Sequence, residues 1–421
     1  MKQRADLTFK YNKNLGRHGW LRLTPAYSVK LVSDILDQLD SGQVILEPFC
    51  GTGTTGVSAA EHGFDCDLAD INPFLVWFTN AKTKNYSAQQ RELFDDAGKE
   101  ICRRAMKPMK EKAWLPDLHN IERWWNPGRL TVLAEIRAHI DAVDVTPTVR
   151  DLLKIAFCPV MIEWSNAAFN HQSMSFHEAD QSVFELDERD EIASAFGQSC
   201  ARISSDVSFR LSGKARAYLA DSRSLEGLDD RYTSLITSPP YPNRMSYIRE
   251  LRPYMYWLGF LDNAKEAGEL DWKAIGGTWG CATSRVGTWE PKGHFEKKHK
   301  LIRICSDVAK KSLLLANYIH KYFEDMSEHC VAVKNKMRPD AHVFYIVGNS
   351  KFYDTMVPVE ELYADMLLRA GFVDAKIDRI RKRNSKKELY EFLVSASTPA
   401  ATRRPSLIFT QTKRLDLPLF S

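Results

Sequence analysis

The sequence lacks the marks of a disulfide-rich, secreted or membrane-spanning chain. Its 421 residues include eight scattered cysteines, and no two of them form a CxxC pair. This spacing excludes a disulfide framework and the common zinc sites. Residues 1–6 contain no apolar core of a signal peptide, and charged residues and a proline interrupt the longest apolar stretch, 152–164. We therefore expect a cytoplasmic protein with no metal site and no membrane partner.

A strong excess of charge of one sign is also missing. Lys and Arg total 58 and Asp and Glu total 54, which gives a net charge of +4. This mild excess permits a nucleic-acid partner without demanding one. With 44% hydrophobic and 27% charged residues, the composition excludes a disordered, collagen-like or coiled-coil chain. The length predicts two or three domains.

What the sequence does contain is an alternation of strand-like and helix-like segments, which is typical of a parallel α/β sheet. Two stretches interrupt it: 85–205 has helical periodicity, and 264–300 is rich in glycine and tryptophan and ends in lysines. A structureless stretch this long suggests a functional role. Seven segments resemble buried strands: 43–47, 64–69, 215–219, 233–237, 342–347, 372–377 and 389–394.

The first predicted strand runs into a glycine-rich turn. Gly51, Gly53 and Gly56 satisfy GxGxxG, and a helical pattern follows. Glycines allow a tight turn and close approach of a ligand, and the helix start offers free N–H groups. Asp70, at the end of the next strand, suits a carboxylate that accepts from ribose hydroxyls. The turn predicts a nucleotide-like cofactor, either a nicotinamide dinucleotide or S-adenosylmethionine (SAM). It lacks the P-loop lysine, so ATP hydrolysis is not expected.

The fourth strand ends in Thr237-Ser238-Pro239-Pro240-Tyr241. Two prolines cannot continue a parallel strand, so the chain must leave the sheet at its carboxyl edge, where ligands bind. A rigid turn with a small polar group and a flat ring suits a planar, amine-bearing ring.

These two motifs together resemble the SAM-dependent amino methyltransferases of DNA, and the TSPPY form resembles the cytosine-N4 enzymes. Segments 16–20, 70–73, 220–222 and 347–350 also resemble motifs of this family. The resemblance implies a Rossmann-like, doubly wound, mostly parallel seven-stranded methyltransferase sheet. It would consist of a cofactor half (1–84), a helical insert of possible DNA-binding role (85–205), a TSPPY half (206–263), a loop-rich target-recognition insertion (264–335), the last strands (336–400) and a tail (401–421).

The same resemblance implies roles for individual residues. Ser238 and the carbonyl of Pro239 would accept the two amine hydrogens, Pro240 would stiffen the turn, and Tyr241 would stack on a flipped-out base. The cofactor residues would be Glu47 at the methionine end, Phe49 near the cofactor, Asp70 on the ribose and Asp221 at the adenine amine, together with Thr24, Gly51, Thr52, Gly53 and Asn72.

The implied partner is double-stranded DNA in a prokaryotic restriction–modification or defence system, with the enzyme at the nucleoid and any restriction endonuclease encoded as a separate chain. Phosphate contacts need basic residues. The basic insertion makes the best candidate, with Arg285, Trp289, Lys292, Lys297, Lys298 and Lys300. Basic stretches at 103–112 and 379–387 are weaker candidates, because runs of charge usually form a solvated face.

Several alternatives stay open at this point. Adenine-N6 methylation is the nearest, followed by methylation of RNA, a nicotinamide oxidoreductase, and a silent DNA-binding or specificity subunit. Cytosine-C5 chemistry is set aside because it needs a Pro-Cys nucleophile. Here Cys158-Pro159 has the reverse order, and Cys50 lies in the cofactor turn; both resemble small buried side chains.

Overall fold

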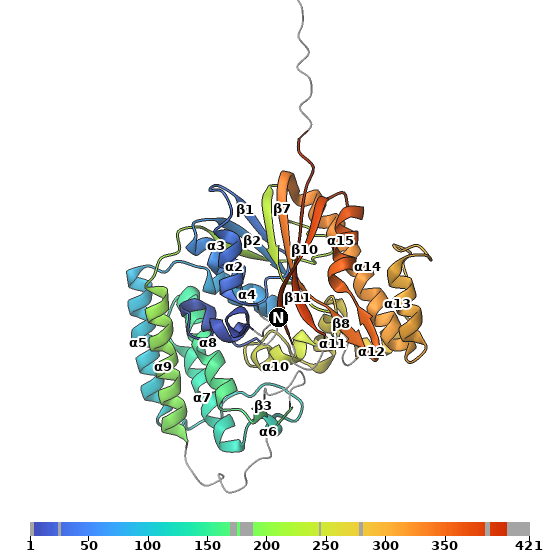
Figure 1. Ribbon diagram of the computed structural model, residues 1–421. Helices are drawn as coiled ribbons and strands as arrows, with labels where there is room; N and C mark the ends of the chain where they lie inside the picture. Colours follow the sequence, from blue (N-terminus) through green and yellow to red (C-terminus); the bar gives the residue numbers. More distant parts are fainter. Residues whose placement is uncertain are drawn as a thin grey trace, which may run out of the picture.

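A computed structural model describes residues 4–23, 27–168, 175–176, 188–243, 246–277, 281–383 and 388–401. Its centre is a seven-stranded sheet of order β10-β11-β7-β6-β1-β2-β5 (Figure 1). The five strands from β7 to β5 are parallel, and β11 is antiparallel to both of its neighbours. All seven predicted strands are confirmed, as β1 (Val44–Glu47), β2 (Asp65–Asp70), β5 (Ala215–Leu219), β6 (Tyr232–Thr237), β7 (Met337–Gly348), β10 (Val373–Lys382) and β11 (Tyr390–Ser397).

The strand order reverses between β1 and β6. From β1 the chain moves outward to β2 and β5, and then returns to place β6 on the other side of β1, with Ile45 paired to Ser234. Ligands of open α/β sheets bind at such a reversal, outside the carboxyl ends of the strands. The glycine turn after β1 and the proline turn after β6 therefore lie at the same edge.

Successive strand residues face opposite sides of the sheet, so each side carries its own apolar core. Ile45 and Ile236 belong to one cluster, and Leu46 and Leu235 belong to the other. The first core contains α2 (Val29–Leu36), α4 (Pro73–Lys82) and α10 (Tyr247–Trp257), with α3 (Thr54–Glu61) against β1 and β2. The second contains α13 (Lys300–Ala309), α14 (Leu313–Lys336) and α15 (Val359–Arg369). This is the doubly wound arrangement that the sequence predicted.

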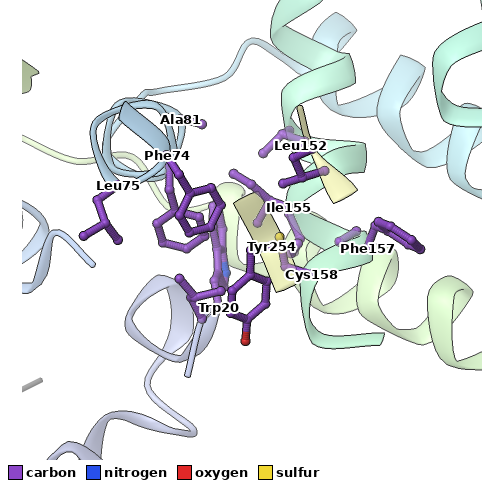
Figure 2. Close-up of a cluster of buried hydrophobic side chains, with 14 of the residues drawn as sticks. Trp20, Phe74, Leu75, Ala81, Leu152, Ile155, Phe157, Cys158 and Tyr254 are labelled. Atoms are coloured by element: carbon purple, nitrogen blue, oxygen red, sulfur yellow. The ribbon is translucent and has the colours of Figure 1, made fainter. Parts of the chain in front are cut away.

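The insert at 85–205 is helical, as predicted, and joins the first core. Figure 2 shows residues of α4, α8 and α10 meeting in it, where the rings of Phe74 and Tyr254 stack with centroids 5.6 Å apart. The α10 helix begins six residues after Tyr241, so the insert packs against the helix that follows the proline turn. Its elements are α5 (Ala88–Ala105), α6 (Ile121–Trp124), α7 (Pro127–Ala142), α8 (Pro147–Glu163), β3 (Ala167–Ala168), β4 (Ser175–Phe176) and α9 (Arg189–Val207).

The insertion at 264–300 contains more helix than its glycines indicate. It holds α11 (Ala264–Lys273) and α12 (Cys281–Gly287), and regular structure is absent over 288–299. The side chain of Asn263 caps α11 by accepting from the N–H of Glu266, and Gly276, with φ of 76°, falls between the helices. The two helices can form because most of these glycines lie between α11 and α12 or at a helix end.

The remaining elements of the described chain are short. Within the described ranges, no helix is both long and apolar enough to cross a membrane. The short elements are η1 (Ala5–Leu7), α1 (Phe9–Asn12), η2 (Gly16–Gly19), β8 (Ser350–Phe352) and β9 (Thr355–Val357).

Candidate active site

One pocket at the carboxyl edge of the sheet gathers eight of the thirteen predicted catalytic and cofactor residues. It measures about 930 Å³, counting the space at its open mouth. Its wall comes from the loops that follow β1, β2, β5 and β6, which the strand reversal brings together. The predicted residues that line it are Phe49, Gly51, Thr52, Asp70, Asn72, Asp221, Ser238 and Pro240.

The glycine turn is held in a conformation that suits glycine. Gly51 and Gly53 have φ of 49° and 74°, in the left-handed region. The N–H of Gly53 donates to the carbonyl of Cys50 (2.8 Å), and buried Lys82 donates its ammonium to the carbonyl of Thr52 (2.7 Å). Burial lowers the pKa of Lys82 to about 7. Lys82 thus holds the glycine turn in place, and α3 begins directly after Gly53.

Asp70 braces this turn and lines the pocket. One carboxylate oxygen accepts from the N–H of Gly51 (3.0 Å) and the other from the N–H of Asn72 (2.9 Å). Burial raises its pKa to about 6. Hydrogen bonds from the Cys50 thiol and the N–H of Ile71 also act to lower the pKa of this carboxylate. Asn72 itself caps α4 by accepting from the N–H of Phe74 (3.0 Å).

Glu47 does not line the pocket but lies buried behind it. It accepts from the hydroxyls of Tyr27 (2.6 Å), Thr55 (2.7 Å) and Thr237, and from the N–H of Phe49 (3.1 Å). Burial raises its pKa to about 7. The Glu47 side chain thus links Tyr27, which precedes the sheet, to the glycine turn and to the end of β6.

Asp221 faces the pocket with its carboxylate already held by Arg223, whose Nη2 lies 2.6 Å from Oδ2. Burial acts to raise the pKa of Asp221, but the hydrogen bonds from Arg223 leave it below the ordinary value. The same guanidinium donates to the carbonyl of Lys273 (2.8 Å). Lys273 and Ile275, from the insertion, complete this wall of the pocket.

In the proline turn, Ser238 and Pro240 line the pocket, whereas Pro239 and Tyr241 do not. The guanidinium of Arg383 lies 5.0 Å from the centre of the Tyr241 ring and covers part of it. Stacking of a base on this ring therefore stays a prediction.

The pocket contains an aromatic ring that the sequence did not single out. Tyr247 lines it and accepts from the N–H of Tyr241 through its hydroxyl (3.0 Å). Its position six residues after the proline turn was the available signal. Ile248 and Leu251 line the pocket from the same helix as Tyr247. The other wall residues missed had no such signal, because they come from separate elements: Leu23, Tyr27, Leu75, Lys273, Ala274 and Ile275.

Segment 16–20, which precedes the first strand and resembles a motif of the family, has a structural role in this fold. Buried Arg17 donates to the carbonyls of Lys82 (2.9 Å) and Phe209 (2.8 Å), which fixes the segment against the first face of the sheet. None of residues 16–20 lines the pocket. Thr24 lies outside the described residues.

The six predicted DNA-contacting residues do not line the pocket. Trp289 packs edge-on against His320, with ring centroids 5.4 Å apart, while Lys297 and Lys298 are exposed and form no ion pair with the part of the chain that the structure describes. The other three are ion-paired: Arg285 with Glu269, Lys292 with Glu328 and Lys300 with Glu361. In contrast, Arg383, from the basic stretch 379–387, contacts the proline turn; Lys386 and Lys387 of that stretch lie outside the described residues.

Sequence comparisons find similar known proteins. A family model described as D12 class N6 adenine-specific DNA methyltransferase matches residues 29–112. The type II methyltransferase M.BsoBI of Geobacillus stearothermophilus is 33% identical over 100 residues, which are 23% of this chain and 19% of that protein. The type II methyltransferase M.AvaI of Nostoc is 23% identical over 418 residues, covering 89% of this chain and 83% of that protein.

Solved structures give more distant matches. A SAM-dependent methyltransferase from Methanosarcina mazei aligns with 87% of this chain and 97% of its own, at 8% identity and a TM-score of 0.31. An rRNA methyltransferase from Streptomyces viridochromogenes aligns with 89% and 86%, at 10% identity and a TM-score of 0.28.

Proposed function

We propose that this methyltransferase, whose cofactor is SAM, methylates the exocyclic N4 amine of cytosine in double-stranded DNA, as the modification enzyme of a type II restriction–modification system. One observation carries the proposal. The pocket that holds Gly51 and Asp70 also holds Ser238 and Pro240. The glycine turn and the proline turn therefore face the same space.

The residues present fit the cofactor. Asp70 lines the pocket and would accept from ribose hydroxyls, the left-handed glycines permit close approach to the backbone, and Phe49, Ile71 and Ile275 provide apolar walls. When bound, SAM supplies an electrophilic methyl group. Asp221, already held by Arg223, keeps a fixed carboxylate edge toward the pocket.

On the substrate side, the proline turn offers acceptors to an amine. The carbonyl of Pro240 accepts from the hydroxyl of Tyr322 (2.7 Å), whereas the carbonyl of Pro239 has no hydrogen-bond partner among the described residues. Ser238 and the Pro239 carbonyl would take the two amine hydrogens and draw the nitrogen lone pair out of conjugation with the ring. The base must leave the duplex to reach them, at a cost of a few kcal/mol.

The carboxylate of Asp70 predicts a pH dependence of SAM affinity. Only the ionised form accepts from both ribose hydroxyls, and its pKa is about 6. Affinity is therefore expected to fall as pH falls, by about tenfold between pH 7 and pH 5. Calorimetric titration of SAM across this range measures it. Asp70→Asn should bind weakly at every pH; a variant that retained the wild-type slope would assign the dependence to another group.

Adenine-N6 methylation is the second candidate, favoured by the family model that matches residues 29–112. That match covers the cofactor half of the sheet and ends before Ser238, which would face the target base. The resemblance of the TSPPY turn to the cytosine-N4 enzymes is the reason to rank cytosine first.

Incubation of the full chain with labelled SAM and plasmid DNA, followed by nucleoside mass spectrometry, decides between them. N4-methylcytosine is expected. N6-methyladenine would select the second candidate, and an absence of labelled DNA would reject both. RNA in a parallel reaction tests the remaining alternative substrate.

We also propose that the duplex is gripped by the insertion around 264–300, including Lys297 and Lys298, by Arg383 near the proline turn, and by part of the insert at 85–205. A separately encoded restriction endonuclease would be the partner of such a modification enzyme, acting with it at the nucleoid.

A further inference from the structure

A chain of hydrogen bonds leads from the pocket to a buried ion pair on the last strands. The hydroxyl of Ser238 donates to the hydroxyl oxygen of Tyr241 (3.3 Å), and that hydroxyl donates to Oε1 of Glu391 (3.1 Å). Arg381 donates to both oxygens of Glu391, at 2.7 Å and 3.2 Å. Glu391 is 5% exposed, so solvent contributes little to this arrangement.

Counting protons along this chain fixes its direction. An ionised carboxylate can only accept, and the paired guanidinium can only donate. Tyr241 has one proton, which goes to Glu391; burial and the neighbouring carboxylate raise its pKa well above the ordinary value, so the proton stays on. Its oxygen then accepts the single proton of Ser238. The Ser238 hydroxyl can therefore offer only its lone pairs to a ligand in the pocket.

We propose that Glu391 is a positioning residue that acts through Tyr241 to make the Ser238 hydroxyl an obligate acceptor, so that the pocket selects a base edge bearing an N–H donor. This inference rests on the proposed function and deepens it. A hydroxyl free to rotate can accept from an amine or donate to a carbonyl, and so tells them apart poorly. A hydroxyl with a committed proton favours the amine and disfavours a carbonyl in the same place.

The ion pair lies far from the proline turn in the sequence but close to it in the fold. Glu391 lies on β11 and Arg381 on β10, 153 and 143 residues after Ser238, and the sheet order alone brings them close. Had Glu391 been a neutral amide, it could donate as well as accept, and the direction of the chain would be undetermined. The ion pair thus supplies a polarity that no residue near Ser238 in the sequence provides.

The test uses full-length wild type, Tyr241→Phe and Glu391→Gln, with Glu388→Gln as the matched control, because Glu388 is an exposed glutamate of the same hairpin. The target site is first mapped by sequencing methylated plasmid. Two duplexes then carry at that site either the amine base or its deaminated, carbonyl-bearing counterpart. Affinity for each is measured with sinefungin, a SAM analogue that transfers no methyl group.

Wild type and Glu388→Gln are expected to prefer the amine duplex by about tenfold or more. Tyr241→Phe and Glu391→Gln, the two relay variants, are expected to lose most of that preference. Because every variant meets the same two duplexes, the cost of unpairing cancels from the comparison. The relay variants should also lose about tenfold in kcat, with little change in KM for SAM.

An unchanged preference in both relay variants would overturn the inference, even if kcat fell, since a merely structural role predicts that result. Should Glu391→Gln unfold because Arg381 loses its partner, Tyr241→Phe decides alone, as it leaves the ion pair in place. A wild type that methylates no DNA would instead reject the proposed function itself, together with the inference that rests on it.

Discussion

Replacing Ser238 with alanine is expected to lower kcat for DNA methylation by roughly a hundredfold or more, the effect of removing a preorganised group that acts in the transition state. SAM affinity should change little, since Ser238 lies at the proline turn and Asp70 and the glycine turn remain intact. Single-turnover transfer from labelled SAM measures the rate, and calorimetry measures the affinity.

Ser306→Ala is the control for this substitution, because Ser306 is an exposed serine whose hydroxyl donates to a carbonyl of its own helix. It should methylate DNA at the wild-type rate. Undiminished transfer by Ser238→Ala would remove the proline turn from the chemistry. Equal losses of SAM affinity and rate would instead place Ser238 in cofactor binding.

The second large effect is expected from Gly53→Ala. Its φ of 74° is costly for alanine, and the added methyl would lie 2.8 Å from Cγ2 of buried Thr79. Together these should lower the free energy of unfolding by roughly 3 kcal/mol. The glycine turn would have to shift, so SAM affinity should fall as well, by about tenfold or more if one hydrogen bond is lost. Denaturant unfolding and calorimetry measure the two effects.

Gly63→Ala separates backbone strain from the clash. Gly63 has φ of 84°, yet no atom lies within 4 Å of its added methyl. It should be destabilised by about 1 kcal/mol and bind SAM normally. Adding Thr79→Ala to Gly53→Ala should recover part of the lost stability, a coupling that distant sites do not show. Equal destabilisation of Gly53→Ala and Gly63→Ala would contradict the clash.

The sequence indicated the sheet well because strand signals are local. Short apolar runs such as 43–47 and 233–237 lie next to turn residues that end them, and each appears as a strand within a few residues of the predicted bounds. The seven strands and the segments that connect them then limit the possible strand orders of the sheet. The insertion at 264–300 was less predictable, since glycine content does not distinguish a loop from two short capped helices separated by glycines.

The contacts of the site were less accessible, because they join residues that are distant in the sequence. Nothing beside Glu47 indicates that three hydroxyls would converge on it, and nothing beside Tyr241 indicates that Arg383 would cover its ring. By sequence, the basic stretch at 379–387 is a weaker DNA-binding candidate than the insertion. In the fold, however, its Arg383 contacts Tyr241 of the proline turn, and its Arg381 pairs with Glu391, which accepts from Tyr241.

By itself, the sequence determined the chemistry available to this protein: a glycine turn with an acidic residue one strand later, and a proline turn ending another strand. Those features depend on neighbouring residues and survive in any fold that keeps the strands. The tertiary structure decided that both turns share one pocket and that hydrogen bonds link Ser238 through Tyr241 to an ion pair on the last strands. Hydrogen-bond direction depends on atoms within about 3 Å of one another, and only the folded sheet brings those atoms together.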